Sequence, residues 1–282
     1  MKNMKVAIIG IGLIGGSMAL ALKEKGLAEK ITGVDEHVGH QEKAMELGLV
    51  DEIMELEAAV ENAELVIIAV PVNAAEKIIT TILDKIDKQV VMDVGSTKSS
   101  LCKLISGHKN EKRFVATHPM WGTEYSGPAA AVKGAFENKA VVICNKENAD
   151  KDAVECVERM YQQLGMHLLY MDAVAHDLHA AYISHISHIT SFALANTVLE
   201  KEKEDNAIFE MASGGFESTV RLAKSNPAMW VPIFMQNKEN VLDVLNEHIS
   251  QLRKFKSCLE KENYEYLTEL IENANKIKRI IK

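Results

Sequence analysis

The fold of the N-terminal half is decided by the stretch Val6-Ala7-Ile8-Ile9-Gly10-Ile11-Gly12-Leu13-Ile14-Gly15. Its first four residues are apolar and indicate a buried strand, and residues 17–25 space their apolar side chains like a helix. A strand that runs through Gly-x-Gly-x-x-Gly into a helix begins a dinucleotide-binding unit.

Each glycine of the motif has its own task in such a unit. Gly10 permits the tight turn, Gly12 lets the backbone approach a pyrophosphate, and Gly15 allows the helix to pack closely on the strand. Leu13 and Ile14 belong to the motif that opens the helix, whose free N–H groups and positive dipole end face the phosphates. We therefore predict that all five residues contact the cofactor.

Outward from this motif, the pattern predicts a doubly wound α/β domain over residues 1–171. Short apolar runs alternate with helical spacing, which indicates a mostly parallel sheet covered on both faces. The predicted strands span residues 6–9, 31–34, 65–70, 90–94, 114–117 and 141–143, and the predicted helices span residues 17–25, 40–47, 74–86 and 151–164.

The strand signal disappears from Asp172 onward, so residues 172–282 are predicted to form an all-helical domain. Helical patterns cover residues 173–199, 216–224 and 227–259, and a last helix runs to Lys282. The polar residues 200–205 are typical of a solvated corner between helices. Because about 110 residues of helices form a small core, we expect this domain to complete its core as a homodimer.

The acidic residue after the second strand predicts the choice of cofactor. Asp35 lies 20 residues beyond Gly15, where its carboxylate can accept hydrogen bonds from the ribose hydroxyls. The same carboxylate would repel a 2′-phosphate, and no Arg or Lys follows it in residues 36–38, so NAD is preferred over NADP. Val70 and Pro71 complete the predicted cofactor-binding set. Asp35 as a cap of the next helix is the alternative.

Charge and composition exclude several classes of partner. The 282 residues carry a formal charge of −8 at pH 7, which disfavours nucleic acid and anionic lipid. The uncharged residues 6–22 mimic a secretory signal, but the four glycines among them would break such a helix, so we predict a cytoplasmic protein. The four cysteines contain no Cys-x-x-Cys pair, which argues against a zinc ribbon or a dithiol site.

Three further segments place polar side chains where ligands of such folds bind. They are Asp-Val-Gly-Ser-Thr-Lys at 93–98, His-Pro-Met-Trp-Gly-Thr-Glu at 118–124, and Gly-Gly-Phe-x-x-x-x-Arg-x-Ala-x-Ser-x-Pro-x-Met-Trp at 214–230. With Gly-x-Gly-Leu-Ile-Gly-Gly-Ser at 10–17 and Ser-His-Ile-Ser-His at 184–188, the chain resembles the prephenate dehydrogenases of tyrosine biosynthesis. The resemblance extends, in order, over nearly the whole chain.

The resemblance implies an NAD-dependent oxidation of prephenate, in which hydride loss from the ring carbinol is coupled to loss of the ring carboxylate. The expected products are 4-hydroxyphenylpyruvate and carbon dioxide. His118 is the expected catalytic acceptor for the substrate hydroxyl, because a histidine is mostly neutral above its reference pKa of about 6.5. Ser96 is the expected catalytic hydroxyl that orients the substrate. Each has a structural alternative, a hydrogen-bonded histidine at a strand end and a helix cap.

Substrate-binding residues follow from the same resemblance. Arg221 would bind the side-chain carboxylate of the substrate with its planar fork, and His188, Trp230 and Gly214 would line the same site. Glu124 would pair with a cation and gate the entrance. A solvated charge at Arg221 and a core position at Trp230 are the alternatives.

We predict that the protein holds no metal. On a straight helix, at about 100° per residue, His176 and His179 lie opposite His185 and His188, so the four rings cannot converge on one ion. His176 and His179 are therefore interpreted as ordinary polar positions.

Three other functions stay open. Glu217 and Ser218 stand where the family often has Arg-Asp, and the added carboxylate suggests arogenate, which carries an amine, as a substrate. A β-hydroxyacid dehydrogenase has a similar architecture, but residues 173–199 lack the lysine that it would use. A dinucleotide sensor without turnover would have no need of Ser96, His118 and Arg221 together.

Overall fold

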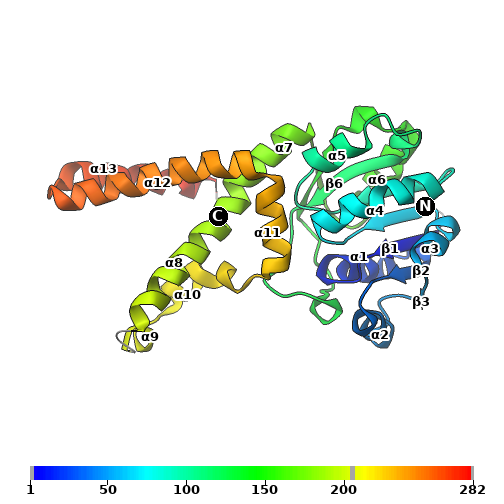
Figure 1. Ribbon diagram of the computed structural model, residues 1–282, viewed down its shortest axis with the longest axis horizontal. Coiled ribbons are helices and arrows are strands. Elements are labelled where there is room, and N and C mark those ends of the chain that lie inside the picture. Colours follow the sequence, from blue (N-terminus) through cyan, green and yellow to red (C-terminus); the bar gives the residue numbers. More distant parts are fainter. Residues whose placement is uncertain (1–2, 204–206, 281–282) are drawn as a thin grey trace. The chain divides into compact units, whose positions relative to one another are not determined.

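The computed structural model describes residues 3–203 and 207–280 of the chain. The chain forms two compact units, residues 1–237 and 238–282, whose helices and some of whose strands are labelled in Figure 1. The sheet and all the predicted site residues belong to the first unit. The domain boundary predicted at residues 171/172 lies inside that unit and stays a prediction.

One eight-stranded sheet, in the order β3-β2-β1-β4-β5-β6-β7-β8, organises the first unit. Neighbouring strands are parallel except β6 and β7. The winding direction changes between β1 and β4, and ligands of such sheets bind beyond the carboxyl ends of the strands at this point. The strands are β1 (Met4–Ile9), β2 (Ala28–Val34), β3 (Glu52–Ile53), β4 (Leu65–Ile68), β5 (Val90–Asp93), β6 (Phe114–Pro119), β7 (Ala140–Cys144) and β8 (His167–Met171).

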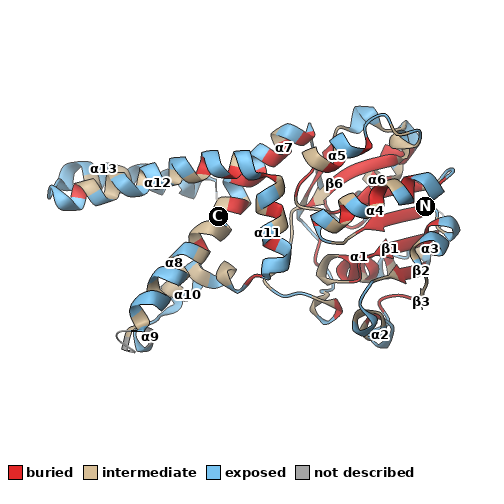
Figure 2. Cartoon of the chain, viewed as in Figure 1, coloured by how far each residue is buried: buried red, intermediate tan, exposed pale blue. Residues whose placement is uncertain are grey.

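Helices cover both faces of the sheet, because side chains alternate between the faces along each strand. On one face, Val6 and Ile8 of β1 pack in a core with α1 (Leu13–Glu24) and α6 (Lys151–Gln163). On the other, Ala7 and Ile9 pack with α3 (Leu56–Asn62), α4 (Val72–Lys85) and α5 (Ser99–Ile105). The strands between these layers are mostly buried (Figure 2). The predicted doubly wound fold is therefore confirmed.

The remaining elements of this half are shorter. They are α2 (Val38–Glu46) and the 3₁₀ turns Glu111–Arg113, Pro128–Ala130 and Lys146–Asn148. The sequence predicts six of the eight strands but misses β3 and β8, and it misses α3 and α5. β3 has two residues, and β8 has no buried residue and so lacks the apolar run that marks a buried strand.

The described residues after Met171 form helices and turns and contain no strand, as predicted. In the first unit these are α7 (Ala173–Ala180), the π turn η4 (Ala181–His185), α8 (Ile186–Glu202), α9 (Ala207–Glu210), α10 (Gly214–Val220), the 3₁₀ turn η5 (Arg221–Lys224) and α11 (Pro227–Gln236). The second unit consists of α12 (Lys238–Glu260), α13 (Tyr264–Asn275) and the 3₁₀ turn η6 (Lys276–Arg279).

Two helical predictions are corrected by these bounds. The helix predicted over residues 173–199 is interrupted by the π turn, and the pattern over residues 227–259 is two helices separated at Asn237. The polar corner predicted over residues 200–205 is helical as far as Glu202, and its residues 204–205 lie outside the described residues. Among the described helices, none combines the length and the apolar character needed to cross a bilayer.

Candidate active site

The glycine-rich turn between β1 and α1 is tightly packed at two positions and open at a third. Gly10 adopts φ +91°, and a Cβ there would lie 2.7 Å from the carbonyl oxygen of Ala69. A Cβ on Gly15 would overlap the carbonyl oxygen of Gly10. Apart from Gly12 itself and its neighbours in the chain, no atom of the described residues lies within 4 Å of the Cβ position of Gly12. The backbone is therefore accessible at Gly12, the position where a pyrophosphate has to approach.

The N-terminus of α1 fits an anionic ligand. Its first residues are Leu13 and Ile14, and no side chain caps the helix, so its first N–H groups can bind phosphate oxygens. Val70 and Pro71 follow β4 beside this turn, and Cγ1 of Val70 lies 2.8 Å from the Cβ position of Gly10.

Asp35 ties the end of β2 to the same turn. Its Oδ2 accepts a hydrogen bond from the Ile11 amide at 3.0 Å, and its Oδ1 accepts one from the His37 amide at 3.0 Å. His40 Nδ1 lies 3.3 Å from Oδ1. The N-cap position of α2 is His37, so Asp35 is not the N-cap residue of that helix.

The loop after β5 is built on a buried ion pair. Lys98 and Asp93 are fully enclosed and bonded to each other, and Lys98 Nζ also donates to the carbonyl oxygen of Thr117 at 2.7 Å. The helix α5 begins after Lys98, so Ser96 is not its cap. In the described part of the chain the Ser96 hydroxyl has no hydrogen-bond partner. It is therefore available to a ligand at the carboxyl end of β5.

His118 belongs to a chain of three side chains that connects β6 to α7. His118 Nδ1 lies 2.8 Å from His176 Nε2, and His176 Nδ1 lies 2.8 Å from Asp177 Oδ1. Burial, reinforced by the neighbouring His176 and Lys98, holds the pKa of His118 well below its ordinary value of 6.5. His118 is thus neutral at neutral pH and can accept a proton from a substrate hydroxyl.

The interpretation of His176 as an ordinary polar position is wrong. His176 is 2% exposed and touches His118, whereas His179 is exposed. The straight-helix geometry behind that interpretation also fails, because the π turn η4 changes the phase of the helix before His185. The adjacent pair His176-Asp177 was the available sequence signal, since a carboxylate often fixes the tautomer of a neighbouring histidine.

The π turn brings His185 into the same network. His185 is 1% exposed, and Asn237 Nδ2 lies 3.2 Å from its Nδ1 and donates to the backbone oxygen of Asp177 at 2.6 Å. Burial lowers the pKa of His185 to about 4, so this ring is also neutral. π turns occur frequently at functional sites.

His188 and Trp230 form the next part of the site. Their rings stack with centroids 3.4 Å apart and an angle of 26° between the planes. Burial lowers the pKa of His188 below 6.5. Trp230 also packs with Val72 and Ile233, and its indole Nε1 is buried without a hydrogen-bond partner among the described residues. Trp230 is therefore both a core residue and a wall beside the rings of His185 and His188.

Arg221 and Glu124 form an ion pair within one chain. Arg221 Nη1 donates to Glu124 Oε2 at 2.9 Å, and the two side chains are 51% and 13% exposed. A backbone hydrogen bond and the charge of Arg221 lower the pKa of Glu124. Gly214 is exposed at the start of α10, the helix that leads to Arg221.

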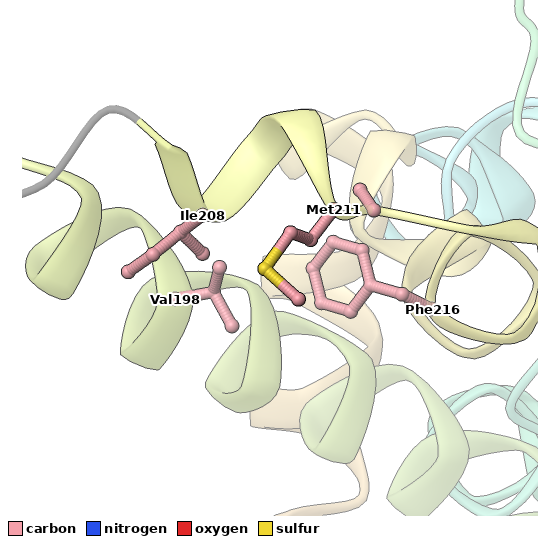
Figure 3. Close-up of a pocket in the computed structure, with 5 residues that line it drawn as sticks. Val198, Ile208, Met211 and Phe216 are labelled. Carbon is pink, nitrogen blue, oxygen red and sulfur yellow. The ribbon is translucent and has the colours of Figure 1, made fainter.

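Two further features of the described residues bear on the site: their potential metal ligands and an apolar pocket. In residues 3–203 and 207–280, no three His, Cys, Asp or Glu side chains are grouped so that they could hold a metal ion. An apolar pocket of about 170 Å³ lies between α8, α9 and α10, lined by Val198, Ile208, Met211, Ala212 and Phe216 (Figure 3). It contains none of the residues proposed for chemistry.

The fold and the glycine-rich turn define a dinucleotide-dependent α/β dehydrogenase. Residues 18–170 match the nucleotide-binding domain of prephenate dehydrogenase, and residues 172–273 match the dimerization domain of prephenate dehydrogenase. The chain belongs to the prephenate dehydrogenase family.

Individual relatives resemble the chain over nearly all of its length. A prephenate dehydrogenase of Bacillus subtilis is 32% identical over 97% of this chain and 76% of the relative. A cyclohexadienyl dehydrogenase of Zymomonas mobilis is 29% identical over 98% of this chain and 96% of the relative. The crystal structure of Aquifex aeolicus prephenate dehydrogenase with hydroxyphenyl propionate and NAD⁺ has a TM-score of 0.89 at 32% identity, covering 99% of this chain and 98% of that chain.

Proposed function

We propose that this chain catalyses the NAD-dependent oxidative decarboxylation of prephenate to 4-hydroxyphenylpyruvate and carbon dioxide. The observation that carries the proposal is the hydrogen-bonded, neutral His118 in β6, next to β5, which leads into Ser96. The resemblance to named prephenate dehydrogenases along the whole chain supports the choice of substrate.

NAD fits the residues at the carboxyl end of β1. Gly10, Gly12 and Gly15 would hold the pyrophosphate at the N-terminus of α1, with Leu13, Ile14, Val70 and Pro71 around it. Asp35 would bind the ribose hydroxyls and would repel a 2′-phosphate. When bound, NAD supplies the hydride acceptor of the reaction.

His118 and Ser96 act on the hydroxyl group of the substrate. As the carbinol C–H bond breaks and the hydride leaves, the O–H proton moves to the free ring nitrogen of His118. The bond to the ring carboxylate breaks, carbon dioxide leaves, and the electron pair completes the aromatic ring. The proton then returns to the phenolic oxygen, so the reaction neither consumes nor releases a proton. The Ser96 hydroxyl orients the same oxygen.

Arg221 binds the side-chain carboxylate of prephenate. To do so it exchanges its bond with Glu124 for two parallel bonds to the substrate, and the exposure of the Arg221 side chain permits this exchange. Glu124 then acts as the gate of the entrance. His188, Trp230 and Gly214 line the site around the substrate.

We assign NAD binding to residues 1–171 and substrate binding and dimerisation to residues 172–282. The match of residues 172–273 to a dimerization domain supports a homodimer. A biosynthetic role with a small-molecule substrate and a diffusible cofactor is suited to the cytoplasm, where we place the protein.

The test is the absorbance of NADH after the protein is mixed with NAD and prephenate, with His118→Asn measured in parallel. The native protein should form NADH, and the variant should lose about 100-fold to 10,000-fold in kcat while it still binds NAD. An unchanged kcat in the variant would contradict the role of His118. No NADH from the native protein, with NAD binding intact, would contradict the reaction.

Arogenate is the comparison substrate because Glu217 replaces a residue of the usual motif. Glu217 is exposed in the first turn of α10. We expect kcat/KM to be higher for prephenate, and a higher value for arogenate would assign the chain to the arogenate-specific members of the family.

A further inference from the structure

We propose that His176 and Asp177 are positioning residues that determine which ring nitrogen of His118 carries its proton. The inference rests on the proposed function only in taking His118 as the proton acceptor. Neither residue belongs to the motifs by which the chain resembles its family, and both are among the few buried polar side chains of the first unit.

The hydrogen bonds link His118, His176 and Asp177 in one continuous series, which runs away from the substrate side of His118. The distance from His118 Nδ1 to His176 Nε2 and the distance from His176 Nδ1 to Asp177 Oδ1 are both 2.8 Å. His176 and Asp177 are 2% and 3% exposed. Water is therefore excluded from the inner two members, and each polar atom depends on its protein partner.

The carboxylate of Asp177, at the end of this series of hydrogen bonds, determines in which direction each hydrogen bond is donated. Asp177 Oδ1 accepts the Lys98 amide at 2.8 Å, and Oδ2 accepts the Ser99 amide at 2.9 Å. Burial raises the pKa of Asp177, but the hydrogen bonds from His176 and the two amides outweigh it and hold the pKa below its ordinary value. Asp177 is ionised and can only accept hydrogen bonds.

The tautomers follow from the carboxylate by the rules of imidazole bonding. His176 must donate from Nδ1 to Asp177, and a neutral ring then has a lone pair on Nε2. That lone pair accepts a hydrogen bond from Nδ1 of His118. The proton of His118 is thereby fixed on Nδ1, and its Nε2 is left with the lone pair that the substrate hydroxyl needs.

The same series of hydrogen bonds stabilises the positive charge that develops on His118 during the reaction. When Nε2 of His118 takes the proton, Nδ1 keeps its hydrogen bond to His176, and the negative charge of Asp177 lies behind that ring. A carboxylate plays this part for a catalytic histidine in the Ser-His-Asp triad, where its loss costs about 10,000-fold in kcat because the wrong tautomer forms. Here one more imidazole lies between the carboxylate and the acceptor.

Asp177 also fixes the loop that carries the catalytic hydroxyl. The amides that it accepts belong to Lys98 and Ser99, which directly follow the Ser96-Thr97 pair. Lys98 in turn bonds the backbone oxygen of Thr117, the residue before His118. One carboxylate therefore connects both catalytic side chains to a single framework.

Two substitutions at residue 176 separate positioning from packing. His176→Gln keeps an oxygen that can accept from Nδ1 of His118, whereas His176→Phe fills the space without an acceptor. We expect His176→Phe to lose about 100-fold or more in kcat and His176→Gln to recover most of that loss. His179→Asn, an exposed histidine of the same helix, is the matched control and should keep the native kcat. Equal losses in Gln and Phe variants of equal thermal stability would overturn the proposal.

The direct readout is the protonation of His118 itself, measured by ¹⁵N NMR of histidine-labelled protein without substrate. The His118 signals are identified by their absence from His118→Asn. We expect the proton on Nδ1 in the native protein and a mixture of Nδ1 and Nε2 in Asp177→Asn, because an amide, unlike the carboxylate, can either accept a hydrogen bond from His176 or donate one to it. A proton on Nε2 in the native protein would overturn the inference. This measurement needs no turnover, so its result is independent of whether prephenate is the substrate.

Discussion

At the scale of single residues, Arg221 provides a sharp test of how the substrate is recognised. Its guanidinium can bond both oxygens of a carboxylate in parallel, and a lysine ammonium cannot. Arg221→Lys should therefore keep kcat within a few-fold but raise the KM for prephenate about 10-fold to 100-fold, the range expected for a hydrogen bond to a charged group. Steady-state kinetics with NAD at saturation measures both constants. An unchanged KM would remove Arg221 from the substrate site.

Glu124→Gln is the matched variant on the other side of this ion pair. Because we propose that Glu124 and the substrate carboxylate compete for Arg221, removing the charge of Glu124 should lower the KM about 2-fold to 5-fold, a small effect because Arg221 is half exposed. A rise in KM would instead show that Glu124 holds Arg221 in its binding position.

The residues of this site that the sequence predicts are those that lie in short, contiguous motifs. His118, Ser96 and Arg221 lie in short motifs whose neighbours in the chain suggest their chemistry. The contact between His118 and His176 joins residues 58 positions apart and depends on how α7 packs beside β6. No spacing rule encodes such a contact, and the assumption of a straight helix led to the wrong interpretation of His176.

At the scale of elements, the strand–turn–helix unit allows stability and cofactor binding to be separated. Gly12→Ala adds a methyl group that no described residue beyond its chain neighbours approaches within 4 Å, so the thermal midpoint should be unchanged. The methyl group would occupy the approach of the pyrophosphate, and NAD affinity should fall at least about 10-fold. Differential scanning fluorimetry and NAD titration check the two expectations.

Gly15→Ala is the matched variant at a tightly packed position of the same turn. Its methyl group would overlap the carbonyl oxygen of Gly10, so α1 must move away from β1. We expect a lower thermal midpoint together with weaker NAD binding. Equal stability of the two alanine variants would contradict the packing described for this turn.

The elements that the sequence predicts best are those buried on both sides. β1, β4 and β5 lie between two helical layers, and their apolar runs follow from that position. β8 is mostly exposed, so its composition is not distinct from that of a loop. The π turn has no recognised sequence pattern, because one extra residue in a helical turn is selected by tertiary contacts and not by local propensity.

At the scale of the whole molecule, three histidines of the candidate site connect it to folding stability. The pKa values of His118, His185 and His188 are lowered in the folded chain, mainly by burial. In the unfolded chain these histidines titrate near 6.5, so below that pH the unfolded state binds more protons than the folded state. Stability is therefore complete above pH 6.5 and falls as the pH decreases toward the folded pKa values.

The size of this effect can be bounded from His185, whose pKa falls from 6.5 to about 4. At about 1.4 kcal/mol per pKa unit, this ring alone removes up to about 3 kcal/mol of unfolding free energy between pH 6.5 and pH 4. The carboxyl groups of Asp51 and Asp177 have pKa values below the ordinary 3.8, so they lose their contribution only at lower pH. The histidines therefore dominate the slope in the window between pH 6.5 and pH 4.5.

Urea unfolding at pH 7.5, 6.5, 5.5 and 4.5 measures this slope. We expect little change between the first two values and a progressive loss of unfolding free energy below pH 6.5. His185→Gln removes one of the titrating rings, so its curve should start lower, because the buried packing is altered, and should be flatter in the same window. A native protein as stable at pH 4.5 as at pH 7.5 would show that the pKa values of these histidines are not lowered by folding, and it would contradict the neutral His118 proposed for catalysis.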